Sequence, residues 1–593
     1  LEALADKSCG YYYETDQTNF SKIPGSPIAY WWKNYSIFDM NIISNNYESA
    51  GRNKTHDNIR YVRNWWEISN LTKWQPYANG GAFRRWAGND LDVVDWSDEA
   101  KSSYASHGGL YNQKYNGMRG ICWNLITSYK NGFRLKHEKH HYSSGSPTII
   151  SKNVNMDYYV LAFLNSVVST SALSMYNPTL NTTVNDVLNL PLIISKENTI
   201  EELSKKSTEL SQRDWDSFET SWDFKKSPLL CYGISICSGA GDYQPSGNGP
   251  IISIGSKIDD THYWLFEKNS SKKCFHLDTT YDLWKKACEE RFLKLKANEE
   301  ELNRIFIDIY GLNDELTPDV ADKDITVHRV YDSKDDVPES MKGSNYVRTL
   351  HDEIVSLVSY AVGCMFGRYS LDVDGLAYAG GEWDESKYKT FIPDMDNCIP
   401  ITDEEYFEDD IVGLFCDWLK KVYGEDTLEE NLDFIAKALG NKGKTSREVI
   451  RSYFLNDFMK DHIKTYQKRP IYWLFDSGKQ NGFKALVYMH RWDADTIGNV
   501  RVEYLHRIQR VYEKEIIRMQ EIIDNSHDNK EISNATKRKE KLQKQIKETK
   551  DYDAKIAHLA LSRIDIDLDD GVKVNYEKVQ TADEKKMQIL AKI

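Results

Sequence analysis

The chain has 593 residues, of which 40% are hydrophobic and 28% are charged, and its net charge is −14. This length allows about three or four domains, and the composition excludes disordered and fibrous classes. No apolar run reaches the roughly 20 residues needed to cross a bilayer, so no membrane partner is expected. Because the chain opens on Leu1 without a signal segment, we expect a piece of a longer polypeptide. Nine scattered cysteines without a C-x-x-C pair predict reduced thiols and a cytoplasmic location.

The first 200 residues are rich in aromatic and amide side chains, with short apolar runs between turn signals. Within them, "KWQPYANGGAFRRWAGN" at 73–89 surrounds two glycines with aromatic rings and cations. Residues 101–152 contain eight lysines or arginines and one acid, Glu138, which gives +7 and leaves −21 for the rest of the chain. One compact segment is therefore basic within an acidic protein, which favours a nucleic-acid contact there.

The later segments predict a mainly helical second half. Residues 157–173 have helical apolar spacing, and residues 189–194 resemble a short strand. A glycine- and serine-rich stretch at 231–262 predicts a flexible insertion, whereas 281–312 predicts a long helix that ends at a glycine. Residues 312–345 are acidic and polar, as in a linker, and 346–520 are mostly helical in pattern. Two apolar stripes at about 499–560 face each other across "SHDNKE", which predicts an antiparallel helical hairpin.

These observations predict an α+β fold, with a mixed α/β DNA-binding domain followed by a mainly helical C-terminal region and the hairpin. The expected divisions are 1–200 for DNA binding, 201–280 as a connector with the insertion, 281–345 as helical spacer and acidic linker, 346–498 as a helical domain, and 499–593 as hairpin and tail.

Three short motifs partly match known catalytic or ligand-binding patterns. "HEKHH" at 137–141 matches the H-E-x-x-H zinc pattern, but Gly132 and "SSGSP" are poor helix context and Lys139 is among several cations that would repel a metal. "GLAYAGGEWD" at 375–384 lacks the spacing of a nucleotide loop, and "TPDVADKD" at 317–324 lacks the spacing of a metal-dependent nuclease, which stays a remote alternative. None of the 14 prolines has a proline neighbour, so the Asp/Asn-Pro-Pro-aromatic turn of amino methyltransferases is not in this sequence. No catalytic, cofactor or metal residue is therefore assigned.

Several longer stretches resemble the second half of the large adenine-specific DNA methyltransferases of BREX phage-defence systems, the PglX type. These stretches run from about residue 22 to 577 and include "KIPGSPIAYW", "KWQPYANGGAFRRWAGN", "DWDSFETSWDF", "LKANEEELNRIFIDIYGLNDELTP", "KRPIYWLFDSGKQNGFKALVYMHR" and "IDIDLDDGVKVNY". The resemblance implies a target-recognition domain that follows an upstream S-adenosylmethionine-binding methyltransferase domain. It also implies double-stranded DNA, other BREX proteins and phage DNA-mimic inhibitors as partners.

Under this resemblance, the cationic and aromatic segments become the expected DNA surface. Arg84 and Arg85 are predicted to read bases, and Lys136 and Lys139 to contact phosphates. About two of the four aromatic residues at 73–89 are expected in the core. The full predicted set is Lys73, Trp74, Tyr77, Arg84, Arg85, Lys114, Arg119, Lys130, Arg134, Lys136, His137, Lys139 and His140. The alternative hypothesis is a protein-interaction scaffold whose helical half docks defence partners, with only incidental DNA contact.

Overall fold

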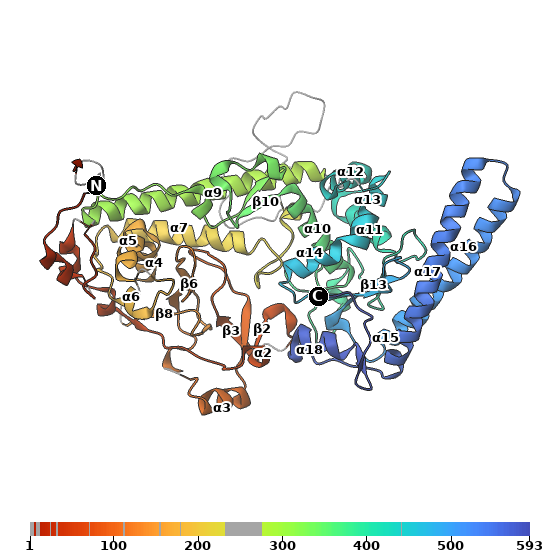
Figure 1. Cartoon of the computed structure of the whole chain (residues 1–593), viewed down its shortest axis with the longest axis horizontal. Helices are drawn as coiled ribbons and strands as arrows, with labels where there is room; N and C mark the ends of the chain where they lie inside the picture. Colours follow the sequence, from red (N-terminus) through yellow and green to blue (C-terminus); the bar gives the residue numbers. More distant parts are fainter. Residues whose placement is uncertain are drawn as a thin grey trace, which may run out of the picture.

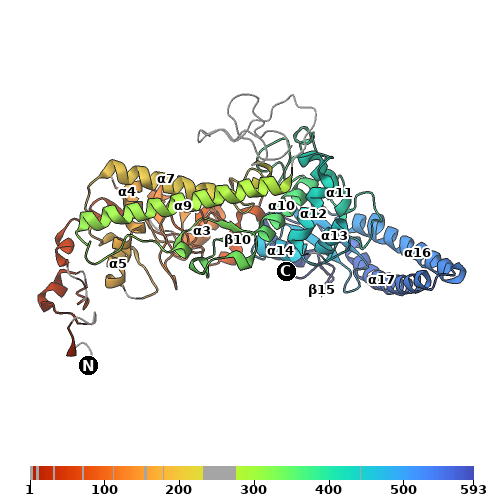
Figure 2. The same cartoon turned by 90° about the horizontal axis from the view of Figure 1, so that it is seen from above.

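The computed structural model describes residues 5–7, 12–23, 25–30, 32, 34–69, 72–110, 113–152, 156–177, 179–231, 276–440 and 442–593. Almost all of the predicted insertion at 231–262 lies outside these residues. The molecule is elongated: the recognition part (residues 1–200) lies at one end, the helical part (346–498) follows, and a helical hairpin projects at the other end (Figures 1 and 2).

Two small four-stranded sheets build the recognition part. The first has the order β1-β8-β5-β6 with antiparallel neighbours throughout, and the second has the order β2-β4-β3-β7, in which β3 and β7 are parallel. The strands are β1 (Tyr47–Ser49), β2 (Val62–Asn64), β3 (Trp74–Ala78), β4 (Asp92–Asp95), β5 (Gly120–Cys122), β6 (Arg134–Lys136), β7 (His141–Tyr142) and β8 (Thr148–Ser151). Helices α2 (Asn58–Tyr61), α3 (Asp98–Ser106) and α6 (Val184–Leu188) lie around them.

The helical pattern at 157–173 forms two helices, α4 (Asp157–Asn165) and α5 (Val167–Tyr176). The chain is extended at Ser166, whose hydroxyl accepts a hydrogen bond from the Ser169 N–H and so caps α5. Among the described residues, no single helix is long and apolar enough to cross a membrane, and α4 and α5 meet that test only together, across a 70° bend. The strand predicted at 189–194 is absent: within this described segment only an isolated bridge joins Ile42 to Pro191.

Helices α7 (Glu197–Trp215) and α9 (Leu277–Tyr310) run side by side along the recognition part (Figures 1 and 2). The first turns of α9 bury Trp284 in the core of the helical part, whereas its later turns bury Phe306 in the core of the recognition part. One 34-residue helix therefore joins both cores. It ends at Gly311, which has a φ of +64°, so the predicted glycine stop is confirmed.

Residues 312–345 differ from the expected linker because they pack into the recognition core. Ile325, Val327 and Met341 are fully buried there. Strand β9 (Arg329–Tyr331) pairs in parallel with β10 (Val347–Thr349), which leads into the helical part. Short apolar runs between the acidic residues make these core contacts. The sequence did not predict them because the segment is polar on average.

The helical part surrounds a three-stranded sheet that the spacing of apolar residues in the sequence did not predict. The sheet has the order β11-β13-β12, and β12 and β13 form a fully paired antiparallel hairpin. Its strands are β11 (Ile399–Pro400), β12 (Tyr472–Asp476) and β13 (Lys484–Tyr488). The helices are α8 (Pro228–Cys231), α10 (Leu350–Met365), α11 (Ile411–Tyr423), α12 (Leu428–Leu439), α13 (Ser446–Asn456) and α14 (Phe458–Thr465).

The predicted helical hairpin is confirmed. After α15 (Thr496–Asn499) and a π-helical stretch (Val500–Leu505), α16 (His506–Asn525) and α17 (Asn529–Leu561) pack against each other. The chain then returns to the recognition part through α18 (Gly571–Lys578) and ends with the strand pair β14 (Thr581–Ala582) and β15 (Lys585–Lys586). Small sheets beside a helical C-terminal region confirm the α+β class.

Candidate nucleic-acid interface

The stretch at 73–89 forms strand β3 followed by a glycine turn and a buried loop. Gly80 and Gly81 have φ values of +94° and +130°, which favour glycine. Trp74, Tyr77 and Trp86 are each at most 3% exposed. Three of the four aromatic residues are thus core residues, one more than expected, and Trp74 and Tyr77 do not present their rings for stacking on DNA.

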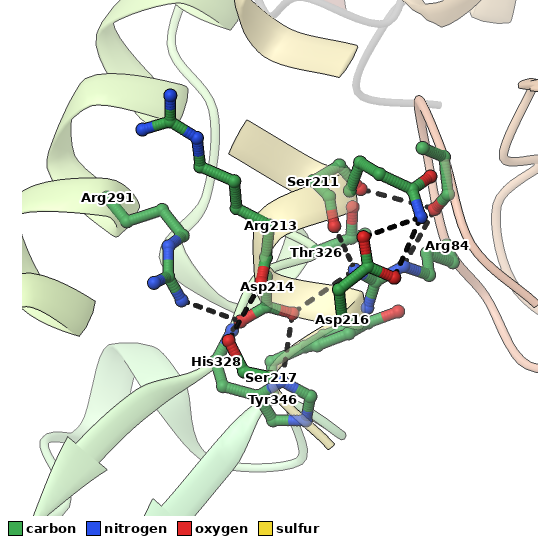
Figure 3. Close-up of polar contacts among 12 residues, drawn as sticks. Arg84, Ser211, Arg213, Asp214, Asp216, Ser217, Arg291, Thr326, His328 and Tyr346 are labelled. Carbon is green, nitrogen blue, oxygen red and sulfur yellow. Dashed lines mark hydrogen bonds and ion pairs between the residues drawn. The ribbon is translucent and has the colours of Figure 1, made fainter. Parts of the chain in front are cut away.

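Arg84, predicted to read bases, is instead buried in an ionic cluster around Asp214 (Figure 3). Its Nη2 lies 3.1 Å from Asp214 Oδ2 on α7 and donates to the Ser211 carbonyl at 2.6 Å. The same carboxylate lies 2.9 Å from His328 Nδ1 and 3.4 Å from Arg291 Nη1. Burial opposes ionisation of Asp214, but His328 and the two guanidinium groups outweigh it and hold the pKa of this carboxyl below its ordinary range.

Arg85 is also buried and binds Glu299 on α9. Its Nη1 lies 2.7 Å from Glu299 Oε2, and Trp86 Nε1 donates to the other oxygen at 2.7 Å. Thr326 accepts a hydrogen bond from the Arg85 backbone N–H at 3.1 Å. In this structure both arginines fasten the loop to α7, α9 and the 312–345 segment, so neither side chain reaches a DNA surface, contrary to their predicted role.

Two further predicted contacts, Arg134 and Lys136, are only 1% and 2% exposed. Arg134 Nη2 donates to Asn124 Oδ1 at 2.9 Å, and Lys136 binds the Gly88 carbonyl and Asp90. His140 also binds Asp90, with Nε2 at 3.1 Å. These side chains satisfy buried polar groups because an unpaired charge would be costly inside the fold, and Lys136 is therefore not placed to contact phosphate as predicted.

Four predicted residues remain exposed: Lys114, Lys130, His137 and Lys139. Lys130 lies 2.6 Å from the buried Asp324, and Lys114 lies 3.7 Å from Glu48. Two more are partly exposed and paired: Lys73 binds Asp569 and Asp95, and Arg119 binds Asp157.

The histidine motif at 137–141 has no helical geometry. His137 begins a turn, Lys139 has a φ of +83°, and His141 lies in β7. The two imidazoles are therefore not on one helical face, as the H-E-x-x-H zinc pattern requires. Among the described residues, no group of three or more His, Cys, Asp or Glu side chains is arranged to hold a metal.

Comparison with known proteins identifies the family. The chain is 37% identical over 612 residues to the adenine-specific methyltransferase PglX of Lacticaseibacillus casei (strain Zhang), which covers 98% of this chain and 46% of that protein. It is 32% identical over 596 residues to the adenine-specific methyltransferase BrxX of Escherichia coli O9:H4 (strain HS), with 96% and 45% covered. No protein-family model matches. The chain belongs to the PglX-type family that its motifs indicated, and it spans just under half the length of these relatives.

Proposed function

We propose that this chain is the DNA target-recognition and C-terminal part of an S-adenosylmethionine-dependent adenine-N6 DNA methyltransferase used in phage defence. The observation that carries the proposal is similarity to two adenine-specific methyltransferases along almost the whole chain. This sequence has no Asp/Asn-Pro-Pro-aromatic turn, which is consistent with methyl-transfer residues that lie in another part of the enzyme.

The described residues do not fit S-adenosylmethionine. Nucleotide-like cofactors bind where several parallel strands meet helix N-termini. In the described part of the chain the parallel strand pairs are β3–β7 and β9–β10, and beyond them only two isolated parallel bridges occur, Asn53–Ser143 and Trp86–Arg134. We therefore derive no step through the cofactor, and assign this chain to DNA binding and positioning.

The exposed members of the predicted set supply the proposed phosphate contacts. Lys114, Lys130, His137 and Lys139 lie on a scaffold that the buried pairs of Arg84, Arg85 and Lys136 hold in place. Lysine attracts phosphate without reading sequence. We therefore assign these exposed side chains to affinity and not to specificity.

The test measures binding of the full 593-residue chain to duplex DNA across a salt series. The double variant Lys114→Ala/Lys139→Ala is expected to weaken binding to every duplex similarly and to reduce the salt slope by about two units. Lys437→Ala, an exposed lysine on α12, serves as the matched control. Unchanged affinity and slope in the double variant would remove these residues from the DNA surface, and no binding by the wild type would refute the proposed function.

The hairpin favours a second candidate function, a docking scaffold for other defence proteins. The α16–α17 pair projects well beyond the helical part in both views (Figures 1 and 2). Its base is fixed, since Tyr512 and Tyr552 donate hydrogen bonds to the carbonyls of Gly482 and Ile589. Removing residues 516–538 should then leave DNA binding intact and abolish capture of other proteins of the same defence system. Full capture by the shortened chain would exclude this role.

A further inference from the structure

A groove runs along the junction between the recognition sheet and α18. It consists of two cavities of about 220 and 760 Å³ that share Lys573 and Val574 in their walls. The smaller cavity is bounded by α2, β2 and the β4 strand, and the larger one by α18 and the β14–β15 pair. The groove therefore touches both the recognition part and the C-terminal region.

Buried contacts fix the two walls of this groove to each other. Glu67, which is 2% exposed, accepts a hydrogen bond from the Val572 N–H at 2.8 Å. Asp569 accepts one from Trp74 Nε1 at 3.0 Å and pairs with Lys73 at 3.2 Å. Because these contacts are made within the chain, the groove is formed before any ligand binds, which lowers the entropic cost of binding.

Two lysines on the groove have no acidic partner among the described residues. Lys468 and Lys573 are exposed, and within the described part of the chain neither forms an ion pair. Arg469, which is 26% exposed, lies beside them and 3.6 Å from the buried Glu67. Of the other acids in the walls, Glu577 pairs with Lys586, and Asp570 is exposed. Lys468 and Lys573 therefore place two cations without ion-pair partners on one groove.

The turn that carries Lys468 is strained. It ends α14, and both Gln467 and Lys468 are left-handed, with φ values of +50° and +61°. Glycine is usual at such a helix end, so both residues hold a backbone conformation that is unfavourable for L-amino acids.

The smaller cavity also contains a hydrogen-bond acceptor. Asp92 lies opposite Asn64 in the β2–β4 register, and its two oxygens accept from Asn64 Nδ2 and Asn79 Nδ2, each at 3.1 Å. Burial raises the pKa of Asp92 to about 6, and the Asn79 hydrogen bond offsets only part of this effect. The carboxylate is held in one orientation, and carboxylates accept hydrogen bonds from the exocyclic amino groups of bases.

We propose that this junction groove binds duplex DNA, with Lys468, Arg469 and Lys573 on the phosphates and Asp92 accepting a hydrogen bond from a base amino group. This inference rests on the proposed function and adds a contact surface outside the basic segment 101–152. DNA fits better than an acidic peptide because a base amino group can donate to the acceptor that the groove offers among its cations, whereas an ionised acidic side chain has no hydrogen to donate.

The experiment uses the full chain and a duplex selected by the wild type from a random pool, together with its scrambled version. Lys468→Ala/Lys573→Ala should weaken binding to both duplexes at least tenfold and lower the salt slope by about two units. Lys573→Arg should retain most of the affinity. Lys437→Ala is the control because α12 lies on the opposite side of the molecule from α18 in Figure 1. Asp92→Asn should weaken the selected duplex about tenfold or more and leave the scrambled duplex unchanged.

The outcomes separate the two proposals. If the wild type binds no duplex, the proposed function fails. If the wild type binds with normal salt dependence and the double lysine variant matches it, only the groove proposal fails. A poly-glutamate peptide that binds the wild type but not the double variant, with DNA binding equal in both, would identify a protein-docking surface and would overturn the DNA assignment.

Discussion

Asp214→Asn should release the 73–89 loop from the body of the protein. The carboxylate of Asp214 is fully buried and neutralises Arg84 and Arg291, and it also accepts hydrogen bonds from the His328 backbone N–H at 2.8 Å and from its ring. Asparagine has the same shape and keeps one acceptor oxygen. Because it carries no charge, the substitution removes the carboxylate that faces two buried guanidinium groups.

The expected loss of stability follows from removing the Asp214 charge while the buried arginines remain. Removing one partner of a buried ion pair costs about 3–5 kcal/mol, which corresponds to more than about 100-fold in an opening equilibrium. Hydrogen exchange of the loop amides measures that equilibrium directly. We expect faster exchange for the Trp86 amide, which is hydrogen-bonded to the Phe133 carbonyl in the wild type. Glu290→Gln, an exposed acid on α9, is the control.

The pH dependence gives a second check. Since the folded-state pKa of Asp214 lies below its ordinary value of 3.8, its stabilisation is present above that pH and is lost as pH falls below it. After correction for intrinsic exchange rates, the wild-type loop should therefore lose protection in acid, and the variant should lose far less. Exchange in Asp214→Asn within twofold of the wild type at pH 7 would refute this account of the cluster.

Two further substitutions test strand β4 and the hairpin base. Asp92→Asn should stabilise the free protein by up to about 3 kcal/mol at pH 7, because the raised pKa of Asp92 means that its ionised form is unfavourable in the folded state. The gain in thermal midpoint should vanish below about pH 4, where the carboxyl is protonated in both states. A loss of stability at pH 7 would contradict this reasoning. Glu548 accepts hydrogen bonds from the Ser477 hydroxyl and from the Gln480 and Gly482 amides at 2.8–3.0 Å. Glu548→Ala should cost about 2–3 kcal/mol and speed amide exchange at Gly482, whereas unchanged exchange there would show that α17 is held by other contacts.

The sequence predicted those helices whose apolar spacing and end signals lie within one continuous segment. Helix α9 and the α16–α17 hairpin follow from apolar spacing within one segment and from a glycine or polar turn at its end. The β12–β13 strands were missed because they are buried throughout, and such runs have no strand-like alternation. The packing of 312–345 was missed because isolated apolar residues such as Ile325 bury themselves only against distant helices.

Several of the predicted DNA contacts are buried or ion-paired for a physical reason that a sequence window cannot reveal. Of the eight lysines and arginines at 101–152, five pair with acids outside that window: Lys101 with Asp98, Lys114 with Glu48, Arg119 with Asp157, Lys130 with Asp324 and Lys136 with Asp90. The local count of +7 therefore does not measure surface charge. Arg84 and Arg85 show the same effect over longer separations, because Asp214 and Glu299 follow more than 120 residues later.

The ion pairs within the chain also determine where a polyanion such as DNA can approach it. Paired cations such as Lys136 and Arg85 add little to the external field, while the excess acids on the surface repel phosphate. Attraction should then be strongest at exposed cations that form no ion pair within the described residues, and two of these, Lys468 and Lys573, share one groove. Since the walls of that groove come from the two parts of the molecule that α18 holds together, a duplex bound there would contact both at once. DNA affinity should accordingly depend on the intact junction, and neither part alone would reproduce it.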